Sequence, residues 1–325
     1  MKALPHVGDK RVIDMHVHIG PELLRRKYSA ESLAAEARRE GFGVVMKNHF
    51  IPTTAQVSQV RRADDKVALI GSVALNFGCG GVDDHGVRSA LSGWKSDVTA
   101  ADPDSQRFVV WMPTVCCEAH LRLYNRRDLS ESWSIKREYT RFYAEGTGYT
   151  FDTANNDKMA AMRRALELIL ERDLILATGH FDRNETLTLV KMAYEMGIRR
   201  IIMTHPLFQS TELDPETMKR MWEQYGAYSE LAFVNLAMDH LTYEQYIEVI
   251  EAVGPKGVIL SSDVGQIFSP NVGDALREFF SEFQKRGIKE DDIVQMSVLN
   301  TNKLLFESMD SKAKAAPVQS LVGVK

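Results

Sequence analysis

Four short apolar runs in this chain each end at a histidine or an aspartate, and this feature constrains the fold more than any other. The runs cover residues 12–18, 174–180, 201–205 and 258–263. An apolar run of this length, bounded by turn residues, is typical of a strand that is buried on both faces. Where such strands lie parallel in a barrel, the residues at their carboxyl ends converge at one end of it. The order of the runs therefore favours an enzyme whose site lies at that end.

Strand-like runs alternate with helical segments through most of the chain. This alternation predicts parallel strands joined by right-handed crossovers. Eight such units predict an α/β fold of the (β/α)8 TIM barrel type, and an open doubly wound sheet is the alternative. No Gly-x-Gly-x-x-Gly pattern follows the first strand, which argues against a dinucleotide site. The eight expected strands cover residues 12–19, 42–48, 67–76, 108–115, 174–179, 200–204, 227–234 and 257–262.

Several helices are expected to begin at residues whose side chains can accept a hydrogen bond from the first turn. One of these residues is followed by a proline at the first helical position, and another has the spacing of a capping box. The four expected N-caps are Ser29, Asn184, Asp214 and Thr242.

Two connections are long, and both follow strands in the first half of the barrel. They cover residues 77–107, after the third strand, and 116–157, after the fourth. Long loops in a compact domain are usually functional or disordered. The second connection is rich in arginines and aromatic residues, so we expect a lid or a contact in a homo-oligomer. A single barrel domain is expected to span residues 1–310, followed by a flexible tail at 311–325.

The composition excludes some classes of protein. The 325 residues are 44% hydrophobic and 26% charged, and the formal net charge is −4. This balance does not suggest a nucleic-acid partner, which favours a basic domain. No run approaches the length of a membrane span, and residues 1–10 lack the apolar core of a signal peptide. With three cysteines, two of them adjacent, we expect reduced thiols in a cytoplasmic protein.

The residues at the strand ends have the chemistry of metal ligands. His16 and His18 are two apart, so on a strand both imidazoles face the same side and can bind one ion. His180, His205 and Asp263 end three later strands and add to the same set. Imidazole and carboxylate ligands suit zinc, and manganese or iron also fits such a mixture. The sequence therefore predicts one or two divalent ions, with zinc as the default.

This arrangement of His-x-His, His, His and Asp at the ends of strands 1, 5, 6 and 8 resembles the amidohydrolase superfamily. The resemblance covers residues 12–306, and residues 297–306 resemble the helix that closes the family's barrel. It implies that His16, His18 and Asp263 hold one ion, and that His180 and His205 hold a second. It also implies a bridging lysine or glutamate, commonly on strand 4, and hydrolysis of C–N, ester or phosphoester bonds.

The chain departs from the family pattern at the bridge. Its fourth strand has no lysine, whereas its second strand carries Lys47, with His49 two residues later. A lysine among metal ligands is costly as an ammonium ion but tolerable as a bridging carbamate or a neutral amine. Alternatively, Lys47 extends to the rim with its stem packed. His49, Glu118 and His120 are candidates for an extra ligand or a substrate contact.

The expected activity is metal-dependent hydrolysis of an amide or cyclic amide bond in a small molecule. Asp263 is the expected proton carrier between the attacking water and the leaving group, and His205 or His180 the expected stabiliser of the oxyanion. The alternatives are a lactonase or phosphotriesterase, a mononuclear metal-dependent decarboxylase, and a metal-binding protein without catalysis.

Other residues are candidates for supporting roles. Asp14, Thr178 and Thr204 are expected either to orient the imidazoles or to serve in packing. Basic residues near the first strand and in the expected lid could bind a carboxylate or a phosphate of the substrate. They are Arg25, Arg26, Lys27, Arg122, Arg126 and Arg127.

Overall fold

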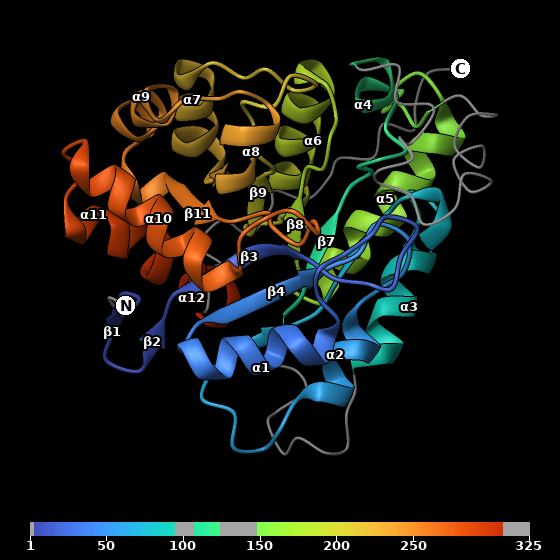
Figure 1. Cartoon of the computed structure of the whole chain (residues 1–325). Helices are drawn as coiled ribbons and strands as arrows, with labels where there is room; N and C mark the ends of the chain where they lie inside the picture. The colour runs from blue at the N-terminus through green and yellow to red at the C-terminus, as the bar shows by residue number, and fades with distance from the viewer. Residues whose placement is uncertain (1–2, 95–106, 124–147, 308–325) are drawn as a thin grey trace, which may run out of the picture.

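The computed structural model describes residues 3–94, 107–123 and 148–307, and within them parallel strands form the centre of the molecule (Figure 1). Three strands pair in the order β3-β4-β5, and six in the order β11-β10-β9-β8-β7-β6. Every pair in both sets is parallel. The strands are β3 (Ile13–His18), β4 (Gly43–Lys47), β5 (Leu69–Ile70), β6 (Ser72–Ala74), β7 (Val109–Trp111), β8 (Ile175–Ala177), β9 (Ile201–Met203), β10 (Tyr228–Ala232) and β11 (Val258–Ser261).

The two sets of strands join at both edges. At one edge β5 and β6 are consecutive pieces of one strand, interrupted at Gly71, where a Cβ atom would lie only 2.6 Å from the Cα of Thr54. At the other edge the backbone N–H of Asp263 donates to the carbonyl of His16 at 2.8 Å. The N–H of His18 likewise donates to the carbonyl of Val264 at 2.8 Å. The strands therefore close into the predicted eight-position barrel.

Helices lie around the outside of these strands (Figure 1). Each strand is two to five residues shorter than predicted, and the end of the predicted seventh strand begins a helix instead. The helices are α1 (Ala30–Glu40), α2 (Thr54–Val60), α3 (Asp84–Trp94), α4 (Glu118–Leu123), α5 (Asn156–Glu171), α6 (Arg183–Met196), α7 (Pro215–Tyr225), α8 (Phe233–Met238), α9 (Tyr243–Val253), α10 (Val272–Lys285), α11 (Glu290–Val294) and α12 (Asn300–Phe306).

Three of the four predicted N-caps are confirmed. Ser29, Asp214 and Thr242 each accept a hydrogen bond from the third residue of their helix. The prediction for Asn184 was wrong, because Asp182 caps α6 and the helix begins at Arg183. Asp182 accepts from the backbone of Glu185, whose side chain accepts from Asp182 in return, so the reciprocal capping box fixes the start two residues earlier.

The two long connections contain helices that the sequence did not indicate. Helix α3 lies in the first, and α4 begins the second. Most of the expected lid, including Arg126 and Arg127, lies outside the described residues, as does the expected tail at 311–325.

The interior of the barrel is polar where the strands end. All six residues of β3 are buried, although three of them are Asp14, His16 and His18. The three cysteines are free and buried, as expected. No helix in the described part of the chain is long and apolar enough to cross a membrane.

Candidate metal centre

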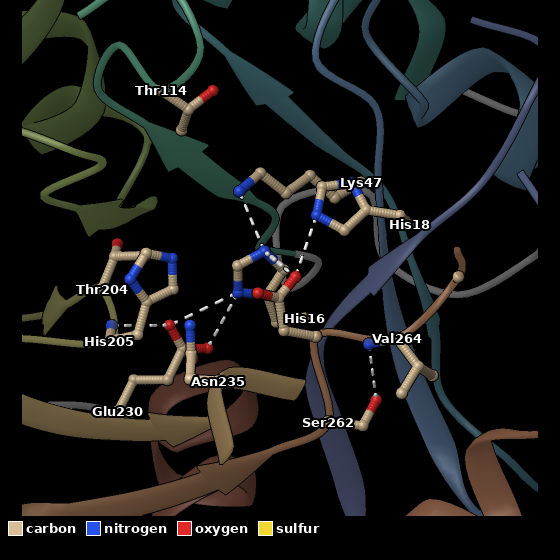
Figure 2. Close-up of polar contacts among 12 residues, drawn as sticks. His16, His18, Lys47, Thr114, Thr204, His205, Glu230, Asn235, Ser262 and Val264 are labelled. Carbon is tan, nitrogen blue, oxygen red and sulfur yellow. Dashed lines mark hydrogen bonds and ion pairs between the residues drawn. The ribbon is translucent and has the colours of Figure 1, made fainter. Parts of the chain in front are cut away.

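Three side chains from opposite ends of the sequence meet where β3 and β11 end. The Nε2 atom of His16 lies 3.1 Å from Oδ1 of Asp263, and Nε2 of His18 lies 3.0 Å from the same oxygen. All three residues are buried. Figure 2 shows His16 and His18 side by side, with Lys47 reaching toward them. The structure thus brings together the residues predicted to hold one ion.

The donor set fits a divalent cation. Oδ1 of Asp263 is buried and makes no hydrogen bond within the described residues, although both imidazoles lie close to it. Burial lowers the pKa of His18 well below its usual value, which keeps this imidazole neutral as a metal ligand requires. Two imidazole nitrogens and one carboxylate oxygen in this proximity are typical ligands of zinc and similar ions.

The backbone is held in unusual conformations at two of the candidate ligands. Asp263 has a φ of 53° and His205 a φ of 24°, in a region that non-glycine residues rarely adopt. Such conformations cost free energy and are concentrated at functional sites. Next to them, Gly265 has a φ of 130°, and a Cβ atom there would lie 2.2 Å from the carbonyl oxygen of His18. The loop after β11 therefore passes directly against the end of β3.

Sequence reasoning missed Glu230, which lies in β10 and is fully buried. Its Oε1 and Oε2 lie 3.2 and 3.4 Å from Nδ1 of His16, and Oε2 accepts the backbone N–H of His205 (Figure 2). Burial raises the pKa of this carboxyl, but His16, His205 and Lys47 outweigh that effect and lower the pKa to about 2. Glu230 is therefore an anion that orients one ligand and anchors another. The sequence feature that could have identified Glu230 is a charged residue inside an otherwise apolar strand.

Lys47 points into the site from β4 and does not extend to the rim. It is fully buried, so the alternative that it reaches solvent is wrong. Its Nζ lies 2.9 Å from Nε2 of His16 and 4.7 Å from the ring centroid of Trp111. Burial lowers the pKa of Lys47 to about 8, against the opposing effect of the Asp263 and Glu230 carboxylates.

The other two predicted ligands, His180 and His205, lie next to each other, and His205 lies next to His16. The rings of His180 and His205 have centroids 4.9 Å apart, and His205 stacks on His16 at 5.9 Å. Nδ1 of His180, however, lies 2.9 Å from Nδ1 of His120, which enters the site from α4. Burial lowers the pKa of His205 to about 4, although Asp263 and Glu230 oppose this shift.

The remaining candidates divide between the site and the surface. His49 is buried, and its ring centroid lies 4.6 Å from that of His18. Glu118 instead accepts hydrogen bonds from Arg122 and from the backbone of Gly148, and lines a surface cavity of about 210 Å³. Arg25 is exposed.

Arg26 differs from its neighbour, because its side chain is only 3% exposed and forms an ion pair with Glu22. Lys27 donates to the backbone carbonyl of Ser269 in the loop after β11. The first-strand loop is therefore tied to that loop.

The side chains of Asp14, Thr178 and Thr204 were expected to orient imidazoles or to serve in packing. In the structure they accept hydrogen bonds from backbone N–H groups. Oδ1 of Asp14 accepts the N–H groups of His16 and Ser262, at 3.1 and 3.0 Å. The hydroxyls of Thr178 and Thr204 accept backbone N–H groups across the neighbouring strand ends. These contacts fix the strand ends, whereas the orientation of the His16 ring depends on Glu230.

Comparisons with known proteins agree with this fold. A family model described as a family of unknown function (DUF6282) matches residues 11–230. No curated protein matches the sequence. Dihydroorotase from Campylobacter jejuni is 13% identical, with a TM-score of 0.50, over 91% of this chain and 83% of that one. An amidohydrolase from Pseudomonas aeruginosa is 10% identical, with a TM-score of 0.50, over 91% of this chain and 95% of that one.

Proposed function

This chain belongs to the DUF6282 family, a family of unknown function, and we propose that it is a metal-dependent hydrolase. The proposed reaction is the cleavage by water of a C–N bond in an amide or cyclic amide of a small molecule. The observation that carries the proposal is the convergence of His16, His18 and Asp263 on one point at the carboxyl ends of the barrel strands.

The ligands divide into two groups. His16, His18 and Asp263 would hold one ion, and His180 and His205 a second, with Lys47 as a further proposed ligand. Zinc is the default for imidazole-rich sites, and manganese or iron also fits. A bound divalent ion supplies Lewis acidity, which polarises a carbonyl group and lowers the pKa of water to about 7.

Two residues have proposed catalytic roles. Asp263 accepts the proton of the attacking water and passes it to the leaving nitrogen, so that one carboxylate serves first as base and then as acid. His205 stabilises the negative charge that develops on the carbonyl oxygen. It is neutral at pH 7, because burial lowers its pKa to about 4.

As a carbamate, Lys47 would be a shared ligand of both ions. The lowered pKa of about 8 leaves part of the lysine as a neutral amine near pH 7, and the neutral amine is the form that adds carbon dioxide. The carbamate is an anion, so it removes the cost of a buried ammonium ion beside two cations.

A second candidate function is a mononuclear lyase, such as a metal-dependent decarboxylase. It is favoured by the surroundings of His180 and His205, which with His120 form a cluster of imidazoles around the proposed second ion. Within the described residues, the site of the second ion also lacks a carboxylate equivalent to Asp263.

The test is turnover by the purified, metal-replete chain on a small panel of amides, cyclic amides, lactones, phosphoesters and aromatic carboxylic acids. Chelator-sensitive release of an amine from an amide supports the proposal. Turnover confined to the lactones or phosphoesters would support a metal-dependent hydrolase that cleaves an ester or phosphoester bond instead of a C–N bond. Carbon dioxide release from the acids selects the lyase.

A further inference from the structure

An arginine with a nearly buried side chain lies near His18 and His49. The side chain of Arg26 is 3% exposed, and its Nε donates to Oε1 of Glu22. A backbone bridge between Arg26 and Gln266 fixes the segment against the loop after β11. No residue in the described ranges accepts a hydrogen bond from Nη1 or Nη2 of this guanidinium. A nearly buried cation with two unused nitrogens has the form of an anion-binding group.

This guanidinium lies close to the proposed ligands. A cluster of three potential ligand atoms, one each from His18, Glu22 and His49, has all its atoms within 4.8 Å of one another. Arg26 forms an ion pair with the glutamate of this cluster. Its charge also lowers the pKa of His18 and of His49, in addition to the larger effect of burial. A ligand that contacts Arg26 can therefore extend to the metal centre.

The cluster of His18, Glu22 and His49 is poorly suited to a second cation. Both oxygens of Glu22 are occupied, because Oε1 accepts from Arg26 and Oε2 accepts the backbone N–H of His49 at 2.8 Å. A cation at this carboxylate would also face the guanidinium. Glu22 therefore holds Arg26 and His49 in place, and its ion pair with Nε leaves Nη1 and Nη2 of the guanidinium available to an anion.

The hydrogen bonds around Asn76 determine which nitrogen of His49 carries the proton. Oδ1 of Asn76 accepts the N–H groups of Thr114 and Cys116, so its Nδ2 must face the other way. This Nδ2 donates to the carbonyl of His49 and to Oγ1 of Thr114, at 2.9 and 2.8 Å. The amide orientation is fixed, because a backbone N–H only donates and a carbonyl only accepts.

The Thr114 hydroxyl is then left with a single acceptor for its own hydrogen. Within the described residues its Oγ1 contacts the donor from Asn76 and, at 2.9 Å, Nδ1 of His49. The hydroxyl hydrogen therefore goes to Nδ1, and the neutral imidazole carries its proton on Nε2. In this tautomer Nε2 of His49 is an N–H donor and is not offered as a metal ligand. A ring nitrogen of His49 lies within 4.8 Å of an oxygen of Glu22, the carboxylate that pairs with Arg26.

We propose that Arg26 and Nε2 of His49 form a subsite for an oxyanion of the substrate, a carboxylate or a phosphate, next to the metal centre. This inference rests on the proposed function for the role of the neighbouring metal site, but the subsite itself consists of residues that are not needed as ligands. It assigns the substrate to the class of small anionic molecules, with the reacting bond a short distance from the charged group.

The test is binding of two probes, acetate and inorganic phosphate, to the full metal-replete chain by calorimetry. We expect one probe to bind saturably and Arg26→Gln to weaken it by about tenfold or more, because a charge-assisted pair is lost. Arg25→Gln is the matched control, since Arg25 is the exposed neighbour and its replacement leaves the affinity unchanged. Tighter binding of acetate identifies a carboxylate substrate, and tighter binding of phosphate a phosphate ester.

Arg26→Gln leaves Glu22 as an unpaired buried carboxylate, so Glu22→Gln combined with Arg26→Gln is the second variant. It removes both charges, and we expect the same loss of anion affinity. Equal affinity in the parent and in either folded variant would overturn the subsite, as would the absence of saturable binding of both probes to the parent. Metal content measured on the same samples tests the proposed function separately.

Nitrogen-15 NMR of the parent chain tests the role of His49 without a substitution. We expect the His49 ring to be neutral and protonated at Nε2. Protonation at Nδ1 would overturn the assignment of His49 as a donor to the oxyanion. Thr114→Val removes the donor to Nδ1 of His49, so we expect it to reduce the population of the Nε2-protonated tautomer and also to weaken anion binding.

Discussion

Nδ1 of His16 lies 3.2 Å from Oε1 of Glu230, while Nε2 of the same ring lies 3.1 Å from Oδ1 of Asp263 (Figure 2). The imidazole is thus held on one side by a carboxylate and presents its other nitrogen to the proposed ion. A carboxylate in this position fixes the tautomer and the orientation of the ring. Glu230 belongs to the metal centre although it is not among the proposed ligands.

Replacing Glu230 by glutamine is expected to weaken metal binding by about 10–100-fold, because the isosteric amide no longer carries the charge that orients His16. The measurement is metal affinity by competition with a coloured chelator. Glu223→Gln, at an exposed position of α7, is the control and should bind metal like the parent. Unchanged affinity in Glu230→Gln would show that the ring is held without this carboxylate.

Asp263→Asn is expected to keep the fold and the metal and to lower turnover by roughly 10²–10⁴-fold, because the amide cannot carry the proton. The measurement is kcat on the best substrate of the panel, with metal content determined on the same sample. Near-normal kcat in a metal-loaded variant would remove Asp263 from the proton transfer.

Gly265 is expected to tolerate no side chain. Alanine there would place Cβ 2.2 Å from the carbonyl of His18, in a conformation with φ at 130°. We expect Gly265→Ala to lower the free energy of unfolding by roughly 2–5 kcal/mol, from strain and overpacking. Gly226→Ala is the control, because its φ is also positive, at 65°, but the added Cβ meets nothing within 4 Å. Its expected loss is about 1–2 kcal/mol, and equal losses in urea denaturation would contradict the close approach.

The stability of the metal-free chain should depend on pH through His205. Burial lowers its pKa to about 4 in the folded chain, from an ordinary value of 6.5. Between these values the unfolded chain binds more protons, so stability falls as the pH decreases from 6.5 toward 4. The slope from this one group is at most about 1.4 kcal/mol per pH unit.

His205→Gln removes that contribution and should flatten the dependence measured by urea unfolding between pH 7 and pH 5. The comparison with the parent isolates His205, because other groups titrate in both chains. One of them is Asp14, whose pKa burial raises to about 7 and which acts in the opposite sense. Parallel pH profiles for the two chains would contradict a buried neutral His205.

The strand ends could be predicted from the sequence because buried parallel strands leave a simple pattern, an apolar run that stops at a polar residue. Glu230 could not be predicted as a site residue in this way, because it lies inside its apolar run and not at the end of it. Only the closed barrel shows that it faces His16. Asn184 and Asp182 are both good N-caps, and the reciprocal bond with Glu185 decides between them.

Helix α3 was missed for a different reason. Its Gly86 and Gly93 lower the helix propensity of the segment, so the sequence indicates a loop. In the structure these glycines permit close packing, since a Cβ at Gly86 would lie 2.7 Å from the carbonyl of Cys79, and one at Gly93 would lie 2.9 Å from the backbone nitrogen of Ala55. Contacts with neighbouring segments outweigh the local preference.

The most direct test of the metal centre is the metal content per chain of protein purified without chelator, beside His18→Ala and Lys47→Ala. We expect two divalent ions in the parent, a loss of metal in His18→Ala, and one ion or fewer in Lys47→Ala. One ion in both the parent and Lys47→Ala would remove the bridge and favour the mononuclear lyase. No ion in the parent under metal-replete conditions would contradict the account.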